Sequence, residues 1–182
     1  LLNRFSLIVA ADNQISVHRL VQAVIQDRLS PEDQKKWAES ALRMVNDAFS
    51  FSQYDQKTWE KCSEIFSSAF YVSEHAQRYE ASLQETAHLL NNLGLCLVNR
   101  MELPYARIVL EKALAIGENV IGSEHIGVAS IVSNLGKVLK EQSDLVGAKR
   151  CRERALAIDE KALGPENTSV ATDVNNLGSV LI

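Results

Sequence analysis

The sequence predicts a mainly α-helical solenoid, a stack of repeated helix pairs, with a short β-hairpin and one helix before the stack. The tripeptide Asn-Leu-Gly returns at residues 92, 134 and 176, an interval of 42 residues each time. Its surroundings return with it, since Glu111–Ile116 reads Glu-Lys-Ala-Leu-Ala-Ile and Glu153–Ile158 reads Glu-Arg-Ala-Leu-Ala-Ile. A fixed period of this length is the signature of a repeat array.

One repeat unit contains two helices. Apolar residues recur every three or four positions from Leu83 to Leu97 and again from Ala106 to Ile121, as they do on one face of a helix. Ser82, with Glu85 three residues later, suits the start of the first helix. Pro104 suits the first turn of the second helix, and Gly122 its end. Each unit is therefore a helix, a short turn and a second helix.

The chain before these repeats predicts a β-hairpin followed by a helix. Residues 5–10 and 15–17 are rich in β-formers, and residues 11–14 favour a turn between them. A helix is expected from His18 to about Leu29. The apolar stripe that we expect this helix to bury consists of Leu20, Val21, Val24, Ile25 and Leu29.

A less regular helix pair is expected next. Ser30 and Pro31 suit the start of a helix that runs to about Phe49, and a second helix is expected from about Gln56 to about Arg78. The pair lacks the Asn-Leu-Gly tripeptide, but Cys62 and Ala69 stand 44 residues before Ala106 and Ala113. We interpret it as a degenerate leading repeat, with Trp37 and Trp59 in its core.

These patterns divide the chain into three parts: hairpin and helix (1–29), degenerate repeat (30–80) and regular repeats (81–182). The last part holds two complete units, Leu83–Ile121 and Ile126–Leu163, and the first helix of a third. We expect apolar residues of that last helix to be partly exposed and to favour association between copies of the chain. They are Val174, Leu177, Val180 and Leu181.

Composition argues against several functions. The net charge is −4 and the isoelectric point is about 5.6, so nucleic acid is a poor partner. We expect a cytoplasmic protein without a signal peptide, whose three cysteines are buried, reduced thiols, because the sequence contains no apolar run long enough to span a membrane. No catalytic or metal-ligating spacing connects its histidines and cysteines, so we expect no enzyme activity and no cofactor in this chain. The histidines are His18, His75, His88 and His125.

The repeat resembles the tetratricopeptide repeat, because small residues at Gly94, Ala106 and Ala113 lie among leucines at the spacing of that family. The loops Gly122–His125 and Gly164–Asn167 resemble those of the longer variant found in kinesin light chains. This resemblance implies a right-handed α-solenoid whose first helices line a concave groove. It also implies that the groove binds a protein or a peptide.

The same resemblance assigns Asn92, Asn134 and Asn176 to the groove. An amide side chain offers donors and an acceptor, and it can bind the backbone of an extended peptide without selecting its sequence. In the other interpretation, each asparagine bonds to the neighbouring repeat and keeps the stack in register. Lys137 and Lys140 would favour an acidic segment. The remaining residues assigned to the groove are His88, Asn91, Leu95, Asn99, Ser133, Asn175 and Ser179.

A second resemblance lies at the start of the chain. Residues Ile15–Gln22 are similar to the winged-helix segment of NB-ARC (STAND) signalling ATPases that carries a methionine-histidine-aspartate motif. His18 matches the histidine, whereas Val17 and Arg19 do not match its neighbours. The resemblance implies that residues 1–29 end a winged-helix subdomain and that the repeats are a sensor module in signal transduction. His18 would read ADP or ATP together with an upstream nucleotide-binding domain only in a longer parent; in this chain we expect it to cap or pack its helix.

Two alternatives remain open at this point. The chain is also compatible with a stand-alone cargo or scaffold adaptor similar to kinesin light chain, which needs the groove but no nucleotide. DNA binding through the winged-helix part would use Arg4, Arg19 and Arg28, and the net negative charge opposes it.

Overall fold

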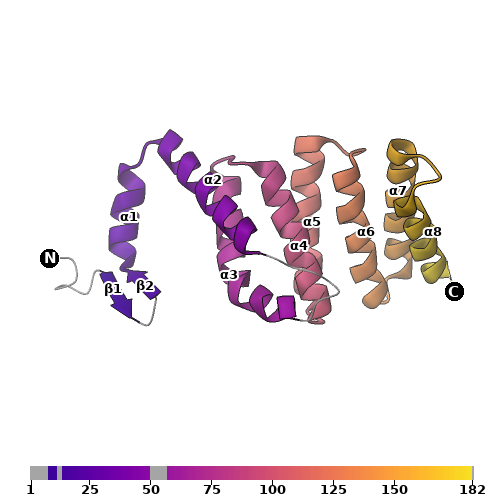
Figure 1. The fold of residues 1–182 in the computed structure, drawn as a ribbon, viewed down its shortest axis with the longest axis horizontal. Coiled ribbons are helices and arrows are strands. Elements are labelled where there is room, and N and C mark those ends of the chain that lie inside the picture. Colours follow the sequence, from indigo (N-terminus) through magenta and orange to yellow (C-terminus); the bar gives the residue numbers. More distant parts are fainter. Residues whose placement is uncertain (1–7, 12–13, 50–56, 182) are drawn as a thin grey trace.

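The computed structural model describes residues 8–11, 14–49 and 57–181, and within them the side chains other than those of residues 8–11, 14–16, 57–63 and 181. This part of the chain contains a two-stranded sheet and eight helices. Helices α2 to α8 form a row, and α1 and the sheet stand at one end of it (Figure 1). The helices are α1 Arg19–Arg28, α2 Pro31–Ala48, α3 Lys57–Arg78, α4 Leu83–Asn99, α5 Leu103–Ile121, α6 Ile126–Glu141, α7 Leu145–Leu163 and α8 Thr168–Leu181.

The sheet lies within the range expected for a hairpin. Strand β1 (Ile8–Ala11) pairs antiparallel with β2 (Gln14–Val17), with Ile8 opposite Val17 and Ala11 opposite Gln14. The expected residues 5–7, 12 and 13 lie outside the described residues. His18 then caps α1, since its Nδ1 accepts a hydrogen bond from the backbone N–H of Leu20 at 3.2 Å.

The stripe predicted to be buried on α1 is not buried. Leu20, Val24 and Ile25 are 68, 53 and 52% exposed, and none of the residues of α1 counts as buried. The helix is connected to α2 mainly near its end, where Gln34 Nε2 donates to the Gln26 carbonyl oxygen at 2.9 Å. The prediction was wrong because periodicity identifies an apolar face but does not show whether another element covers it.

Helices α2 and α3 form the leading pair. Ser30 caps α2, as predicted, by accepting from the backbone N–H of Asp33 at 3.1 Å. Ala38 and Leu42 are buried on α2, four residues apart, whereas Trp37 is 66% exposed. The core position predicted for Trp37 is therefore wrong, because neighbouring helical residues point about 100° apart. The side chains of Trp59 and Cys62 lie outside the described part.

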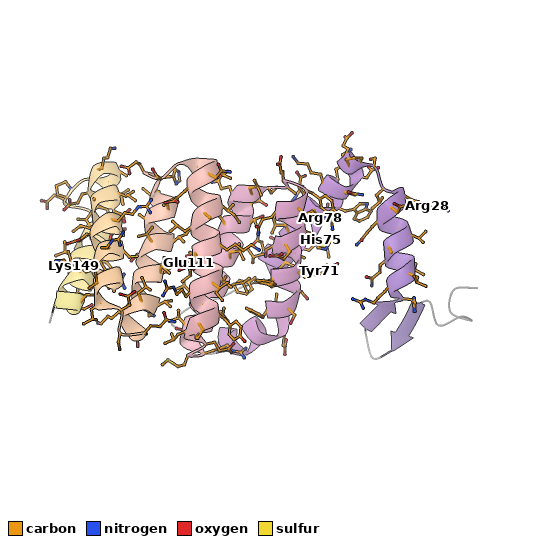
Figure 2. The ribbon with its side chains drawn as sticks, turned by 180° about the vertical axis from the view of Figure 1, so that it is seen from behind. Arg28, Tyr71, His75, Arg78, Glu111 and Lys149 are labelled. Carbon is orange, nitrogen blue, oxygen red and sulfur yellow. The ribbon has the colours of Figure 1, made fainter. Side chains whose placement is uncertain are left out.

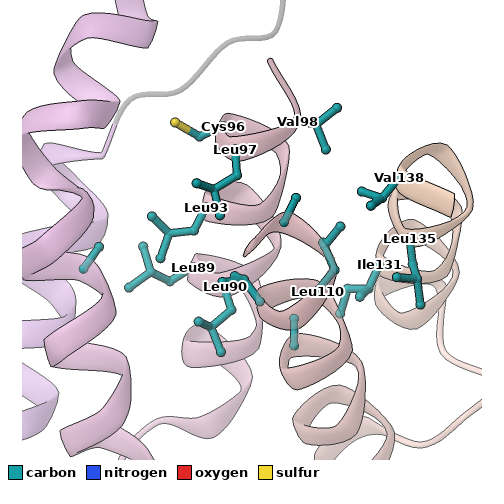
Figure 3. Packing of buried hydrophobic residues seen from close by; sticks show 14 of the residues in the cluster. Leu89, Leu90, Leu93, Cys96, Leu97, Val98, Leu110, Ile131, Leu135 and Val138 are labelled. Carbon is teal, nitrogen blue, oxygen red and sulfur yellow. The ribbon is translucent and has the colours of Figure 1, made fainter. Parts of the chain in front are cut away.

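The main core extends from α2 to α8 and is centred on α4, α5 and α6, and leucine and alanine are its most frequent residues (Figure 3). Gly94 lets α4 and α5 approach closely, since a Cβ atom there would lie 2.5 Å from Leu110 Cγ. Gly136 is equivalent, and a Cβ atom there would lie 3.1 Å from Cys151 Cβ and 3.3 Å from Arg152 Nε. The small residue of the tripeptide therefore serves helix packing.

The predicted helix end at Gly122 is confirmed, whereas the predicted side-chain cap at Ser82 is not. Gly122 and Gly164 end α5 and α7 with φ of 89° and 83°, which favours glycine. His125 caps α6, with Nδ1 accepting from the Gly127 N–H at 3.0 Å. Ser82 differs, because its φ of 42° is left-handed and its side chain makes no capping hydrogen bond. Its carbonyl oxygen instead accepts from the Thr86 N–H at 3.0 Å.

The helices from α2 onward form two layers. We call α2, α4, α6 and α8 the inner layer and α3, α5 and α7 the outer layer. Within the inner layer α2 contacts α4, and α4 contacts α6. Figure 2, seen from behind, shows the outer layer on the near side, with Tyr71 on α3, Glu111 on α5 and Lys149 on α7.

Different side chains connect successive helices in the two layers. The short amides of Asn91 and Asn134 connect α4 to α6. Long charged pairs connect the outer helices: Glu74 with Lys112, and Glu118 with Arg154 at 2.5 Å.

The cysteines differ from the prediction. Cys96 is 1% exposed and disulfide-bonded, so the predicted reduced thiol is wrong there. Cys151 is free and half-buried, as predicted, and burial raises the pKa of its thiol. Among the residues that the structure describes, none of the helices is both long and apolar enough to span a lipid bilayer.

Candidate functional site

The repeated asparagines occupy the same position on three inner helices but make different contacts. Asn134 Nδ2 on α6 donates to Asn91 Oδ1 on α4 at 2.9 Å, and Asn91 is only 7% exposed. Asn92 Nδ2 instead lies 3.4 Å from His88 Nδ1 on its own helix. Asn134 thus joins two repeats, which is the register role, while Asn92 contacts only its own helix in this way.

Two clefts lie in the described part of the inner layer. The α2–α4 cleft has a volume of about 580 Å³ and the α6–α8 cleft one of about 430 Å³. The first is lined by Arg43, Asn46, Asp47, Phe49, Gln84, Glu85, His88 and Asn92. The second is lined by Ile126, Gly127, Ala129, Ser130, Ser133, Asn134, Asp159, Leu163, Ser169, Thr172, Asp173 and Asn176. Five predicted residues therefore line a cleft, divided between two places: His88, Asn92, Ser133, Asn134 and Asn176.

The other predicted groove residues line neither cleft. Leu95 and Asn99 are half-buried, and Asn99 Nδ2 is buried without a hydrogen-bond partner in the described part of the chain. Lys140 Nζ donates to Ser179 Oγ at 3.1 Å, which joins α6 to α8. Lys137 is half-buried and Asn175 is exposed.

The floor of the α6–α8 cleft carries buried charge. Asp159 and Asp173 line the cleft, and Arg152 lies beside them on α7, with its Nη1 donating to Ser133 Oγ at 2.5 Å. Arg152 is 6% exposed and Asp173 5%. Asp159 Oδ1, Asp173 Oδ2 and Arg152 Nε are buried atoms without a hydrogen-bond partner among the described residues.

The surroundings of Asp173 change its acidity. Burial and the neighbouring charge of Asp159 raise the pKa of Asp173 to about 6, although Arg152 and Ser133 act in the opposite direction. Burial lowers the pKa of Arg152, while the charge of Asp173 raises it. The cluster therefore contains two acidic side chains but only one basic side chain, Arg152.

This cluster was not predicted, although the sequence contained a signal. At an offset of 42 residues, Arg152 corresponds to Leu110, Asp159 to Gly117 and Asp173 to Ile131, and at twice that offset Asp173 corresponds to Leu89. Leu110, Ile131 and Leu89 are all buried. Comparing each buried position with its repeat partner would have identified Arg152 and Asp173 as charges at apolar positions.

A third cavity lies between α1, α2 and α3, with a volume of about 480 Å³ and a mainly apolar lining. Aromatic rings of α3 and of Tyr79, which follows it, form one wall: the centroid of Tyr71 lies 4.3 Å from that of His75, which lies 5.9 Å from that of Tyr79. Figure 2 shows Tyr71 and His75 on the part of α3 that faces α1. Trp37 and Ile25 complete the lining, so the exposed residues of α1 and α2 border a hollow. Burial, and then Arg78, lowers the pKa of His75.

Comparison with known proteins supports the repeat assignment. Residues 85–161 match the family model described as "Tetratricopeptide repeat", which agrees with the repeats predicted in this part of the chain. No curated protein matches the chain. In the part of the chain that the structure describes, none of the groups of histidine, cysteine and acidic side chains has the arrangement of a metal site.

Solved structures share the fold. BtubC (BKLC) from P. vanneervenii is 19% identical, with a TM-score of 0.60 over 84% of this chain and 66% of that one. A protein of Podosopora anserina, described as a kinesin light chain with nearly identical TPR-like repeats, is 17% identical, with a TM-score of 0.58 over 83% of this chain and 66% of that one. This chain therefore spans slightly less than two thirds of their length and shares their solenoid fold.

Proposed function

We propose that this chain is a protein-binding module and that its inner layer binds an extended segment of a partner protein. The observation that carries the proposal is that two clefts open on the inner layer and that each is lined by an asparagine of the repeated tripeptide. Asn92 lies in one cleft, and Asn134 and Asn176 lie in the other.

The amides retain capacity for a ligand. An asparagine side chain has two N–H donors and a carbonyl oxygen with two lone pairs. The bond from Asn134 to Asn91 uses one donor, so its other donor and its oxygen are available to a peptide backbone. Such contacts support binding of an extended chain without fixing its sequence, and the side chains around each cleft then supply selectivity.

We propose further that the repeats act as a sensor module in a larger NB-ARC-type ATPase in the cytoplasm. His18 Nδ1 accepts from the Leu20 N–H, so Nε2 is the ring nitrogen that would contact a nucleotide. The exposed apolar side of α1 suits contact with an upstream domain. A stand-alone adaptor would use the same inner layer without this contact.

Self-association through α8 has a smaller surface than the sequence suggested. Val174 is 52% exposed and Leu177 half-buried, but Val180 is only 8% exposed. The side chain of Leu181 lies outside the described part. Self-association therefore ranks below binding of a partner segment.

A displayed library of random 12-residue peptides, selected on the immobilised chain, tests the binding proposal. We expect enrichment of a peptide set and at least tenfold weaker binding after Asn92→Ala combined with Asn176→Ala. Asn119→Ala is the matched control, because Asn119 is exposed on outer helix α5. Absence of enrichment, or equal losses in the control, would overturn the proposal.

The nucleotide proposal has its own test. In the full-length protein, His18→Ala should weaken ADP binding about tenfold, measured by calorimetry, which corresponds to about 1.4 kcal/mol. Unchanged ADP affinity would refute the sensor role of His18 and favour the adaptor.

A further inference from the structure

We propose that the α6–α8 cleft selects a partner segment carrying a cationic side chain, lysine or arginine, which lies over Asp159 and Asp173. This inference rests on the proposed function and adds the chemistry of the residue that the cleft receives. Three independent features of the molecule support it: the position of the charges in the repeat, their unbalanced sum and the character of the cleft walls.

The charges occupy positions where the preceding repeat is apolar. Leu110 packs against Gly94 in the first regular repeat, and Arg152 packs against Gly136 in the second. Likewise Asp173 stands where α6 has Ile131. A buried ion pair is seldom more stable than well-packed apolar residues of similar size. Stability alone therefore gives no reason for these charges.

The cluster has two acidic side chains against one basic side chain, and one oxygen of each acidic side chain has no hydrogen-bond donor among the described residues. Arg152 can balance one carboxylate, and its Nη1 is directed to Ser133. Asp173, which is 95% buried, lines the cleft with Oδ2 lacking a donor, and Asp159 Oδ1 lacks one too. A lysine ammonium or an arginine guanidinium supplies both the missing charge and the missing N–H groups.

The walls of the cleft suit the rest of a peptide. Hydroxyl and amide groups surround the carboxyl groups, from Ser130 and Asn134 on α6 and from Thr172 and Asn176 on α8. Ile126 and Leu163 provide apolar surface at the same opening, against which the methylene stem of a long basic side chain can pack. An uncharged cluster of this shape would have no preference for such a side chain.

The cleft changes the expected charge of the partner. Lys137 and Lys140 suggested an acidic segment from sequence, but Lys140 is engaged with Ser179. The carboxyl groups of the cleft instead favour a basic residue at this point of the groove.

The test uses the displayed library of random 12-residue peptides on the 182-residue chain. Sequencing of the selected pool should show lysine or arginine enriched at least fivefold at one position, and the ratio of the two residues distinguishes an ammonium from a guanidinium. Synthetic peptides with that residue replaced by glutamine should bind at least tenfold more weakly.

Three variants identify the cleft as the cause. Asp173→Asn should reduce both the affinity and the basic preference, while Glu160→Gln, an equal charge change at an exposed position of α7, should leave both unchanged. Arg152→Leu with Asp173→Ile copies the preceding repeat and provides a second variant, expected to fold and to lose the basic preference. Circular dichroism verifies the fold of each variant.

The outcomes separate this inference from the proposed function. Enrichment of peptides without a basic preference would overturn the cationic pocket and leave peptide binding intact. A basic preference that Asp173→Asn leaves unchanged would also overturn it, since the preference would then arise from the overall negative charge. Absence of any enrichment would overturn both.

Discussion

The ionised form of Asp173 should destabilise the folded chain, and Asp173→Asn should therefore stabilise it at neutral pH. Burial and Asp159 raise the pKa of Asp173 from its ordinary 3.8 to about 6. A carboxyl group with a raised pKa in the folded state binds its proton more tightly there than in the unfolded chain. The free energy of unfolding then falls as the pH rises from about 4 to about 6, and the whole cost is present above about pH 6.

The size of the effect follows from the same shift. One pKa unit corresponds to about 1.4 kcal/mol, so the full shift would correspond to about 3 kcal/mol. Asp173 lies beside Arg152 and borders an open cleft, so screening reduces the expected cost to about 1–2 kcal/mol. The amide of asparagine stays neutral at every pH and avoids this cost.

Urea unfolding followed by circular dichroism measures the difference between wild type and Asp173→Asn at about pH 4.5 and about pH 7.5. We expect the variant to gain about 1–2 kcal/mol relative to wild type between the two pH values. Any effect of the asparagine amide that does not depend on pH is the same at both pH values and cancels in this comparison. If the relative stability of the variant did not change with pH, or fell as pH rose, Asp173 would be stabilised by Arg152 and the reasoning would be refuted.

Three further predictions concern the scaffold. Gly94→Ala should lower the free energy of unfolding, measured in urea, by about 1–3 kcal/mol because its Cβ would overlap Leu110. The control, Gly178→Ala, should cost nothing because no neighbouring side chain lies within 4 Å of its Cβ. Equal effects of the two substitutions would contradict the packing argument. Asn134→Ala should lower the free energy of unfolding by about 1 kcal/mol, and a double-mutant cycle with Asn91→Ala should show coupling between the two side chains. Additive losses would show that Asn134 does not hold the two repeats in register. Iodoacetamide should label Cys151 slowly in the native chain, as followed by mass spectrometry, because burial raises the pKa of its thiol. Cys96 should be labelled only after reduction and unfolding. Labelling of Cys96 in the unfolded but unreduced chain would exclude its disulfide.

The repeat could be predicted because several local signals agreed. The 42-residue period, Pro104 in the first turn of α5 and the glycines at 122 and 164 each placed a helix or a helix end correctly. The wrong predictions concern side chains whose burial or bonding depends on other helices. The apolar face of α1 and the ring of Trp37 remain exposed because no described helix packs over them, and a pattern within one helix cannot show this. Likewise, whether Cys96 forms a disulfide depends on how close another cysteine lies in the folded chain, and spacing along the sequence does not show this.

The candidate site was predicted only in outline. The sequence identified Asn92, Asn134 and Asn176 because they recur, and recurrence selects what all repeats share. Specificity arises from what one repeat does not share, and this is why Arg152 and Asp173 were overlooked. Helical faces were assigned from the periodicity of apolar residues alone. Charged residues such as Arg152 and Asp173 were therefore expected on helix surfaces.

Stability and recognition make opposite demands on the α6–α8 cleft. If the cluster served only packing, the residues of the preceding repeat, Leu110 and Ile131, would serve it without desolvating three charges. If the cluster binds a cation, the stability that it costs the chain without ligand is offset by binding, because the ligand provides the missing positive charge and the missing donors. A variant that becomes more stable and at the same time loses affinity for basic peptides is the result that only the second explanation predicts. Asp173→Asn therefore decides between them when both properties are measured on the same preparation.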